Sequence, residues 1–416
     1  MPHDDHGHPA SAPVKLEVRA SDAIAGRVPR AAYAPSSVDE CAEVMTAAAK
    51  GQLRLGFIGG GTALELGAAP TALDAVVRSE RLTRILEHAP ADMVIVVEAG
   101  ATLAAVQAAV GAHGQRLALD APLAERATIG GLIATGAFGP LRARYGTIRD
   151  LIIGVTLVRA DGEVARGGGK VVKNVAGFDL PKVACGSLGT LGLIAAAAFR
   201  LHPLPEITTT VLAAGLSADA VVALVAAMRQ AQLEPASAVA LTAPGGFDLG
   251  VRFEGFARGV EHQVARLIEL TAAAGTTADR LPDADAASFW RRHDAVRAAA
   301  PLRVRVTGLP TRFPAVAALV SGPDRLGDFA WYATLGIGFA GGPAGDLAAT
   351  TAAITAARAQ LVADGGSLVI EAVPSELRAA IDPWGPPPGS FAIMERLKQR
   401  FDPDRRLNPG RFVGGL

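Results

Sequence analysis

The segment GFIGGGTALELG, residues 56–67, decides how the chain is to be interpreted. It follows a short apolar run, and a strand that leads into clustered glycines is typical of a phosphate-binding loop. Neither of the two common loop patterns fits. A G-x-G-x-x-G pattern counted from Gly59 meets Leu64 at its sixth position, and a G-x-x-x-x-G-K-[ST] pattern counted from Gly56 meets Thr62 where Lys is required. The loop therefore predicts phosphate binding of another kind.

The charge balance and the cysteine content narrow the possible partners. The chain has 416 residues, with 40 Lys and Arg against 40 Asp and Glu. This length predicts two or three domains, and a formal net charge of zero gives no reason to expect nucleic acid or an acidic membrane surface as a partner. The two cysteines, Cys41 and Cys185, are too few and too far apart for a disulfide framework or a metal site, which favours a reducing compartment.

A mean hydropathy of +0.30 raises the question of a membrane span. The longest apolar run, Leu191–Phe199, is well short of the ~18 residues that a spanning helix needs. Residues 1–14 are acidic and His-rich and have no apolar core of a signal peptide. Chelation of a metal by His3, His6 and His8 is one interpretation of this segment, and a disordered tail is the favoured one. We expect a cytoplasmic protein; a peripheral association with the inner membrane through a complex stays open.

The pattern of prolines and apolar residues divides the chain into an α+β arrangement of two units. The first covers residues 15–205, and the segment RLHPLPE at its end breaks the pattern with two prolines. Residues 206–380 show an order of elements that resembles two β-α-β-β-α units, which predicts an antiparallel sheet with helices on one face. Residues 381–416 begin with a rigid linker and return to the first unit through an amphipathic helix. The predicted inward positions of that helix are Phe391, Met394, Leu397 and Phe401.

The individual elements follow from periodicity and end signals. In the first unit we expect a helix at residues 37–51 with a capping box of Ser37 and Glu40, strands at residues 53–58 and 93–100, a helix capped by Thr102, and two strands joined at Asp161-Gly162. In the second unit we expect strands at residues 207–213, 238–241, 249–253, 302–307, 330–339 and 367–372, with helices at residues 217–230, 260–274, 313–320 and 346–363.

Three glycine-rich segments, residues 56–61, 128–139 and 185–194, stand out from an alanine-rich background. Glycine lets backbone N–H groups approach a ligand closely or curl around an anion. Each segment has Thr or Ser beside its glycines, and none contains Lys. Together they predict a long, phosphate-bearing ligand that is held tightly by backbone amides and hydroxyl groups.

With these motifs in order, the chain resembles the vanillyl-alcohol-oxidase/PCMH-type FAD-binding family. The resemblance rests on FIGGGTALELG, VEAGATLAAVQAAVGAHGQRLALDAP, ATIGGLIATGAFGPLRARYGTIRDLIIGVTLVRADG, VVKNVAGFDLPKVACGSLGTLGLI and FDPDRRLNPGRF. It is strong over residues 36–205 and good in the C-terminal tail, whereas the middle matches only in the order of elements. It implies a PCMH-type FAD-binding domain of two α+β subdomains, with a ferredoxin-like α+β cap domain over the flavin ring.

The resemblance also assigns residues to the cofactor. The first glycine loop and the second match two diphosphate-binding segments of the family, the third lies along the cofactor, and the tail returns near the isoalloxazine ring. The positions implied as FAD-binding are Gly59, Gly60, Gly61, Thr62, Thr128, Gly130, Gly131, Thr135, Gly189, Gly192, Ile194 and Asn408. No His lies between residues 114 and 201, so the resemblance implies non-covalent FAD.

The chain departs from relatives that oxidise 2-hydroxy acids. Their cap carries an H-x-G-x-G-N-x-H segment whose histidines bind a metal or take the hydroxyl proton. Its counterpart here, TLGIGFAGG at residues 334–342, has no His. We therefore assign no metal and no catalytic residue, although a positioned base is worth roughly 10²–10⁴ in rate.

Several residues were considered for a part in the chemistry. Lys173 is a candidate base, with a structural role or a cofactor contact favoured. Arg142 and Arg144 suit a carboxylate substrate, with a surface or intersubunit salt bridge favoured. His293 lies on a predicted amphipathic helix, and we expect it to be exposed. Phe178 stands where many relatives have Tyr.

Within the family, the segment GGKVVKNVAGFDLPKVACGSLGTLG most resembles the FAD-binding accessory subunits of bacterial glycolate oxidases. This implies an FAD-dependent oxidoreductase of 2-hydroxy acids that acts in glycolate-to-glyoxylate oxidation beside a catalytic flavoprotein and an iron–sulfur subunit. Two alternatives stay open: a self-sufficient FAD-linked D-2-hydroxy-acid dehydrogenase, and a structural docking subunit with a vestigial flavin site.

Overall fold

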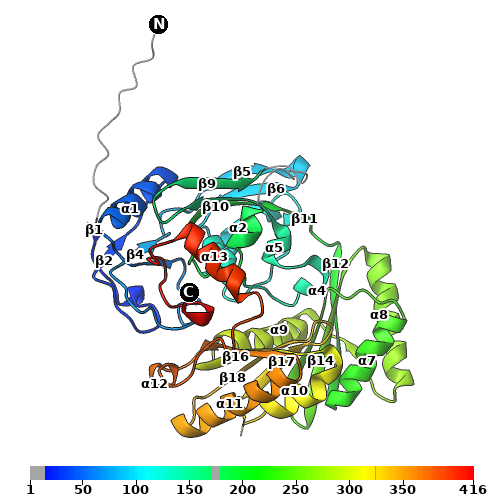
Figure 1. The fold of residues 1–416 in the computed structure, drawn as a ribbon. Coiled ribbons are helices and arrows are strands. Elements are labelled where there is room, and N and C mark those ends of the chain that lie inside the picture. Colours follow the sequence, from blue (N-terminus) through cyan, green and yellow to red (C-terminus); the bar gives the residue numbers. More distant parts are fainter. Residues whose placement is uncertain (1–14, 170–178, 324) are drawn as a thin grey trace.

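The computed structural model describes residues 15–169, 179–323 and 325–416 (Figure 1). The predicted tail of residues 1–14, and the predictions for Lys173 and Phe178, lie outside them. The described residues form two modules. The N-terminal module comprises residues 15–203 with the returning segment 391–416, and the cap module comprises residues 207–378.

The N-terminal module contains two main sheets. The first has the order β1-β2-β4-β3, in which β2, β4 and β3 are parallel to one another. The second is antiparallel, with the order β5-β6-β10-β8-β9. The strands are β1 (Lys15–Leu16), β2 (Ala31–Tyr33), β3 (Leu55–Ile58), β4 (Ala75–Arg78), β5 (Ile85–Ala89), β6 (Val94–Glu98), β8 (Ile152–Val158), β9 (Val164–Gly168) and β10 (Leu193–Arg200), with β7 (Gln115–Arg116) paired to β11 (His202–Pro203).

Helices fill the connections of this module, and their ends follow local sequence rules. The helices are α1 (Val38–Lys50), α2 (Leu103–Gly111), α3 (Ile129–Thr135), α4 (Arg142–Tyr145), α5 (Ile148–Leu151) and α6 (Leu180–Ala184), with 3₁₀ turns η1 (Ala20–Asp22) and η2 (Pro90–Asp92). Ser37 caps α1 as predicted, by accepting from the amide of Glu40. The predicted reciprocal half of that capping box is wrong, because the Glu40 carboxylate accepts from Ser36 instead. The hairpin predicted at Asp161-Gly162 is confirmed.

The cap module is built on one eight-stranded antiparallel sheet of order β15-β12-β14-β13-β17-β18-β16-β19. Its strands are β12 (Ile207–Leu216), β13 (Ser237–Ala243), β14 (Gly246–Gly255), β15 (Asp279–Arg280), β16 (Leu302–Thr307), β17 (Asp328–Tyr332), β18 (Ile337–Gly342) and β19 (Ser367–Ala372). The single strand predicted at residues 330–339 is wrong. The chain turns at Gly336, whose φ is +69°, so β17 and β18 form an antiparallel hairpin.

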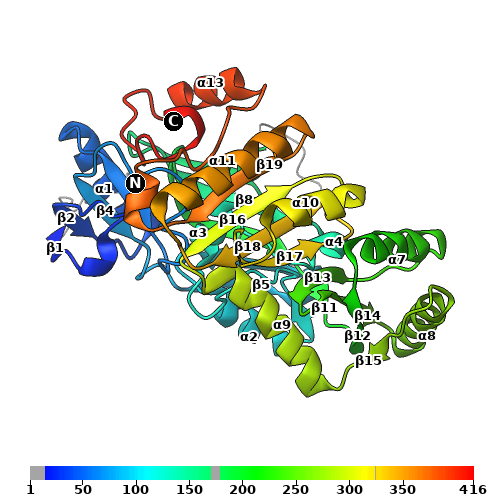
Figure 2. The same ribbon diagram turned by 90° about the horizontal axis from the view of Figure 1, so that it is seen from below.

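Helices cover both faces of this sheet, so the prediction of helices on one face is only partly right. The outer face packs on α7 (Ala218–Gln230), α8 (Ala257–Ala273), α10 (Phe313–Val320) and α11 (Leu347–Ala363) through one large apolar core (Figures 1 and 2). The remaining helix, α9 (Asp283–Ala298), lies on the opposite face, where its Phe289 joins an apolar cluster with Phe339 of the sheet and Phe138 of the N-terminal module. The inner face of the sheet therefore meets the N-terminal module.

The chain then returns to the N-terminal module. It passes η3 (Pro310–Arg312) within the cap and later α12 (Ser375–Arg378), α13 (Phe391–Phe401) and η4 (Val413–Gly415). Leu407 makes a parallel bridge with Leu55 beside the edge strand β3. The four predicted inward side chains of α13 are only half-buried, whereas Lys398 is buried. No helix in the described part of the chain combines the length and apolar character needed to cross a membrane.

Candidate functional site

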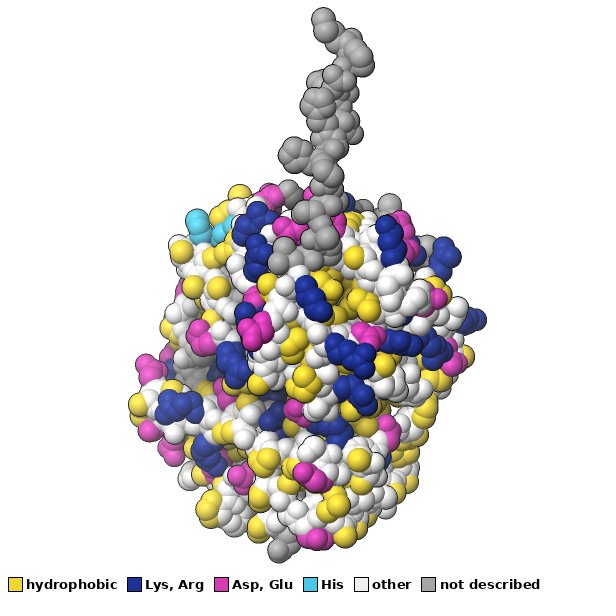
Figure 3. Space-filling view, turned by 90° about the vertical axis from the view of Figure 1, so that its left-hand side faces the viewer, with side chains coloured by type: hydrophobic (Ala, Val, Ile, Leu, Met, Phe, Trp, Pro, Cys, Tyr) yellow, Lys and Arg dark blue, Asp and Glu magenta, His cyan; other side chains and the backbone are white. Residues whose placement is uncertain are grey.

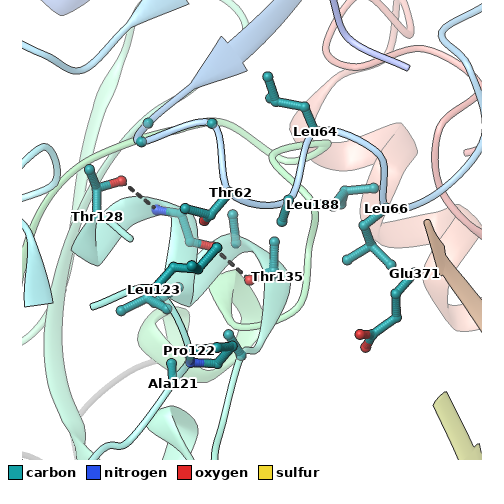
Figure 4. A pocket seen from close by; sticks show the side chains of 18 of the residues that line it. Thr62, Leu64, Leu66, Ala121, Pro122, Leu123, Thr128, Thr135, Leu188 and Glu371 are labelled. Atoms are coloured by element: carbon teal, nitrogen blue, oxygen red, sulfur yellow. Dashed lines mark hydrogen bonds between the residues drawn. The ribbon is translucent and has the colours of Figure 1, made fainter. Parts of the chain in front are cut away.

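The three glycine segments meet at one place, between the two modules. A main pocket of about 1200 Å³ is lined there by residues from both (Figure 4). An inner pocket of about 400 Å³ adjoins it and shares Gly59, Gly131 and Gly189 with it. All twelve residues predicted from the sequence line one or both pockets. The main pocket contains Gly59, Gly60, Gly61, Thr62, Thr128, Gly131, Thr135, Gly189 and Asn408, and the inner pocket adds Gly130, Gly192 and Ile194.

The first glycine loop lies too close to the second segment to carry side chains. A Cβ at Gly60 would lie 1.6 Å from the carbonyl oxygen of Arg126, and a Cβ at Gly59 would lie 2.1 Å from Oγ1 of Thr128. Gly61 has a φ of +70°, which favours glycine. The amides of residues 60–62 donate no hydrogen bond to the described part of the chain. Free amides in a tight turn are suited to bind an anion.

The second segment begins a short helix. Thr128 caps α3 by accepting from the amide of Gly131, and the Thr135 hydroxyl donates to the Gly131 carbonyl at 2.8 Å (Figure 4). A Cβ at Gly130 would lie 2.8 Å from the Cβ of Ala99 on the neighbouring segment. The helix start is thereby held against β6 and faces both pockets.

The tail closes the pocket beside the third segment. The Nδ2 of Asn408 donates to the carbonyl of Leu188 at 2.9 Å, and Asn408 is 2% exposed. Its Oδ1 is buried and has no hydrogen-bond partner in the described structure. A buried acceptor without a partner is costly, so this atom fits an N–H donor of a ligand.

The cap module supplies a cationic wall opposite the glycine loops. Strand β16 has alternating burial, so that Leu302, Val304 and Val306 enter the cap core. The other face of β16 brings Arg303 and Arg305 to the main pocket. In the view of Figure 3, Lys and Arg side chains gather where the two modules meet, some of them in a hollow of the surface.

Arg297 of α9 joins this wall. It is 8% exposed, its guanidinium lies 4.2 Å from the ring centroid of Phe339, and its Nε and Nη1 have no hydrogen-bond partner in the described structure. Glu371 of β19 is the one acidic residue among the described residues that line the main pocket, and its carboxylate points into the cavity (Figure 4). Its Oε1 lies 3.8 Å from Nη1 of Arg305. The wall therefore combines three arginines with one carboxylate.

The structure also places the other residues that the sequence suggested for a part in the chemistry. Arg142 and Arg144 form no salt bridge with described residues, and an intersubunit one stays a prediction: Arg142 lies over the Phe138 ring, and Arg144 donates to the carbonyl of Glu234. The expectation that His293 is exposed is wrong. It is 1% exposed and hydrogen-bonded to Tyr332 and Asp294, and burial lowers its pKa.

Sequence reasoning missed the arginines near the pocket. Arg411 donates to the carbonyls of Leu64 and Leu66 and so shapes the segment after the first glycine loop. Burial, followed by the nearby charge of Arg378, lowers the pKa of Arg411 to about 10. The sequence offered a signal for it, since Arg411 follows directly on the Asn408-Pro409-Gly410 tail. The described residues contain no cluster of three or more side chains suited to hold a metal ion.

This geometry agrees with comparisons to known proteins. Residues 29–168 match the family described as FAD binding domain. Over these residues, the chain is similar to FAD-binding proteins. Its glycine loops, free amides and unpartnered Asn408 acceptor fit that cofactor, because they offer donors to a diphosphate and an acceptor to a ring N–H. The roles of the twelve individual residues, and non-covalent attachment, stay predictions.

Two curated relatives share part of this sequence. The chain is 33% identical to glycolate oxidase subunit GlcD of Bacillus subtilis over 217 residues, which are 52% of this chain and 46% of the relative. It is 37% identical to glycolate oxidase subunit GlcE of Escherichia coli over 123 residues, which are 29% of this chain and 35% of that subunit. The chain thus spans less than half the length of the curated relatives it matches.

A solved structure extends the likeness of the fold to nearly the whole chain. Alkyldihydroxyacetonephosphate synthase superposes with a TM-score of 0.68 at 18% identity, covering 93% of this chain and 78% of that one. At this identity the likeness concerns the fold alone. The predicted fold class, an α+β protein with a PCMH-type domain and an α+β cap, is confirmed.

Proposed function

We propose that the chain is the FAD-binding subunit of a glycolate oxidase-type complex that oxidises a small 2-hydroxy acid. The observation that carries the proposal is the main pocket, where a glycine-lined wall suited to FAD faces three arginines of the cap. A substrate with a carboxylate beside its hydroxyl group suits such a wall. The names of the two curated relatives support the same substrate class.

Bound FAD would supply a hydride acceptor, and the residues of the chain would have to bind the substrate and take its hydroxyl proton. Arg297 is suited to bind the carboxylate, because its Nε and Nη1 are buried and have no hydrogen-bond partner among the described residues. A guanidinium can hold a carboxylate with two parallel hydrogen bonds, which also fixes the orientation of the substrate. The Phe339 ring beneath Arg297 restricts the guanidinium to that position.

Glu371 is suited to accept the hydroxyl proton. Its carboxylate points into the main pocket, and the pocket has no other acidic or histidine side chain among its described lining residues. Arg305 lies beside it, with 3.8 Å between its Nη1 and Oε1 of Glu371. In this proposal Glu371 takes the place of the cap histidines that the sequence lacks.

The same proposal assigns partners to the chain. With two cysteines in its sequence the chain cannot bind a four-cysteine iron–sulfur cluster alone, so electrons would leave to another subunit. We therefore infer a complex with a catalytic flavoprotein and an iron–sulfur subunit, located in the cytoplasm and peripheral to the inner membrane only through that complex.

The test is anaerobic reduction of the purified, FAD-loaded chain by glycolate or D-lactate, followed as loss of the oxidised flavin absorption. Replacing Glu371 with Gln should slow reduction by roughly 10²- to 10⁴-fold while leaving FAD content unchanged. Glu376→Gln, five residues on and exposed on α12, is the control and should reduce at the wild-type rate. Equal rates for Glu371→Gln and the wild type would remove Glu371 from the chemistry.

The same experiment, extended to the assembled complex, separates the alternatives. A self-sufficient dehydrogenase would turn over repeatedly with an artificial acceptor in the absence of other subunits. A docking subunit with a vestigial flavin site would tolerate Gly60→Arg or Gly131→Arg in the complex without loss of activity. Our proposal predicts loss of both FAD and activity in these variants, because a Cβ at Gly60 would lie 1.6 Å from the Arg126 carbonyl oxygen and an Arg side chain at Gly131 would enter the two pockets that Gly131 lines.

A further inference from the structure

A third cavity, here called the side pocket, opens next to the main pocket. Its volume, which is partly open to solvent, is about 990 Å³, and it shares Leu66, Ala134, Thr135, Phe138, Leu188 and Arg305 with the main pocket. Its other side is lined by Arg142 and Gly186 of the N-terminal module, Thr307 and Ser367 of the cap, and Trp384 and Phe412 of the returning segment. The side pocket is therefore continuous with the proposed substrate site but extends away from it.

The charged side chains that line the side pocket are all positive. Arg142 enters it from the N-terminal module and Arg305 from the cap, and its described lining contains no acidic residue. Burial and then the charge of Arg305 lower the pKa of Arg142, against a smaller opposing effect of Asp150. Glu371 approaches Arg305 only at 3.8 Å and lines the main pocket instead.

Arg142 is half-buried, and its side chain makes no hydrogen bond with the described residues. Its guanidinium carbon lies 4.4 Å from the centroid of the Phe138 ring. Stacking on a ring uses none of the five N–H donors of an arginine side chain, so these can serve a ligand. Across the pocket, the hydroxyls of Thr307 and Ser367 lie 2.8 Å apart and can supply a further donor. By contrast Arg144, two residues on, is exposed and donates to a carbonyl.

We propose that the side pocket holds a carboxylate-binding subsite between Arg142 and Arg305, through which a small carboxylate reaches the main pocket. Arg142 rests on Phe138 and presents its N–H groups edge-on to the anion, and Arg305 is shared with the substrate site, so that the anion can pass from one pocket to the other. The subsite requires only an anion of this class and does not depend on which hydroxy acid is oxidised.

The experiment uses oxalate, a small dicarboxylate with no hydroxyl group to oxidise, as the probe. Its binding to the FAD-loaded full chain is measured by isothermal titration calorimetry at two KCl concentrations. Arg142→Gln should raise the dissociation constant for oxalate by about 10- to 100-fold, because a charge-assisted pair of hydrogen bonds is lost. Arg144→Gln changes the net charge by the same amount on the same helix, and it should change the constant by less than twofold.

Three outcomes would overturn the proposal: no oxalate binding by the wild type, the same constant in Arg142→Gln as in the wild type, or an equal loss in both variants. The second outcome would place oxalate at Arg297 alone, and the third would reduce the effect to overall surface charge. Unchanged FAD content and circular dichroism in both variants exclude misfolding as the cause. If oxalate binds through Arg142 but glycolate never reduces the flavin, the subsite stands and the proposed function falls.

Discussion

Replacing Lys398 with Met is the sharpest test of how the returning segment holds the pocket together. Lys398 is 1% exposed, and its Nζ donates to Asp402 at 2.7 Å, to the carbonyl of Thr190 at 2.9 Å and to that of Leu407 at 3.0 Å. Thr190 belongs to the third glycine segment, and Leu407 precedes Asn408 of the pocket. One ammonium group thus joins the helix, the glycine segment and the tail.

The magnitude follows from what the substitution leaves behind. Asp402 is fully buried, and without Lys398 its carboxylate keeps only the amides of Arg406 and Leu407 as donors. Removing one partner of a buried ion pair costs about 3–5 kcal/mol, because the other charge stays buried without compensation. The double variant Lys398→Met with Asp402→Asn buries no charge and should recover most of this loss, since replacing both partners is often nearly neutral.

The assay is urea unfolding of the apo-protein followed by circular dichroism, together with retention of FAD after ultrafiltration. Lys182→Met serves as the control: Lys182 pairs with Asp179 at the same 2.7 Å, but both side chains are about half exposed, so the loss should be within about 1 kcal/mol. A free energy of unfolding for Lys398→Met within 1 kcal/mol of the wild type would refute the reasoning. So would a double variant as unstable as the single one.

Two further predictions concern the N-terminal module. Burial raises the pKa of Asp120 to about 6, so the stability that this carboxyl contributes is present below its ordinary pKa of 3.8 and lost as the pH rises through 6. Asp120→Asn should raise the free energy of unfolding at pH 7 by about 3 kcal/mol and should make this free energy depend less on pH between pH 4 and 6. The measurement is urea unfolding of both proteins at several pH values in this range. The same pH dependence in the variant and the wild type would contradict the prediction. Gly60→Ala, whose Cβ would overlap the Arg126 carbonyl, should abolish FAD retention, whereas Gly111→Ala, with no atom within 4 Å, should retain FAD at the wild-type level in equilibrium dialysis.

The glycine residues that line the pocket could be predicted from the sequence. Gly59, Gly130 and Gly189 lie far apart in the chain, and only their shared composition and order connected them before the structure placed them at adjoining pockets. Local signals such as the Ser37 cap and the Asp161-Gly162 turn were also sufficient, because the residues that fix them are neighbours in sequence.

The cap arginines of the cationic wall could not be assigned to the pocket from the sequence, for a physical reason. The alternation of Arg303 and Arg305 with apolar residues reveals that they share a face of β16, but not what that face meets. That depends on pairing with β18 and β19 and on docking of the cap, which are contacts between distant segments. The prediction for His293 failed for the same reason: an amphipathic helix does not reveal which of its polar residues faces the sheet, and His293 lies on the buried stripe of α9 with Phe289 and Arg297.

The pairing of the tail with β3 has a consequence for how the protein is made. Leu55 donates to the carbonyl of Arg406 and accepts from the amide of Asn408, and the Thr71 hydroxyl reaches Pro409, 338 residues away. A ribosome releases β3 and the first glycine loop long before these partners exist, so this edge of the sheet stays unpaired until residues 406–411 have been synthesised. The cofactor site is completed only once those residues have emerged. Loading of FAD must therefore wait for this segment, and until then the edge of β3 is open to pairing with other strands.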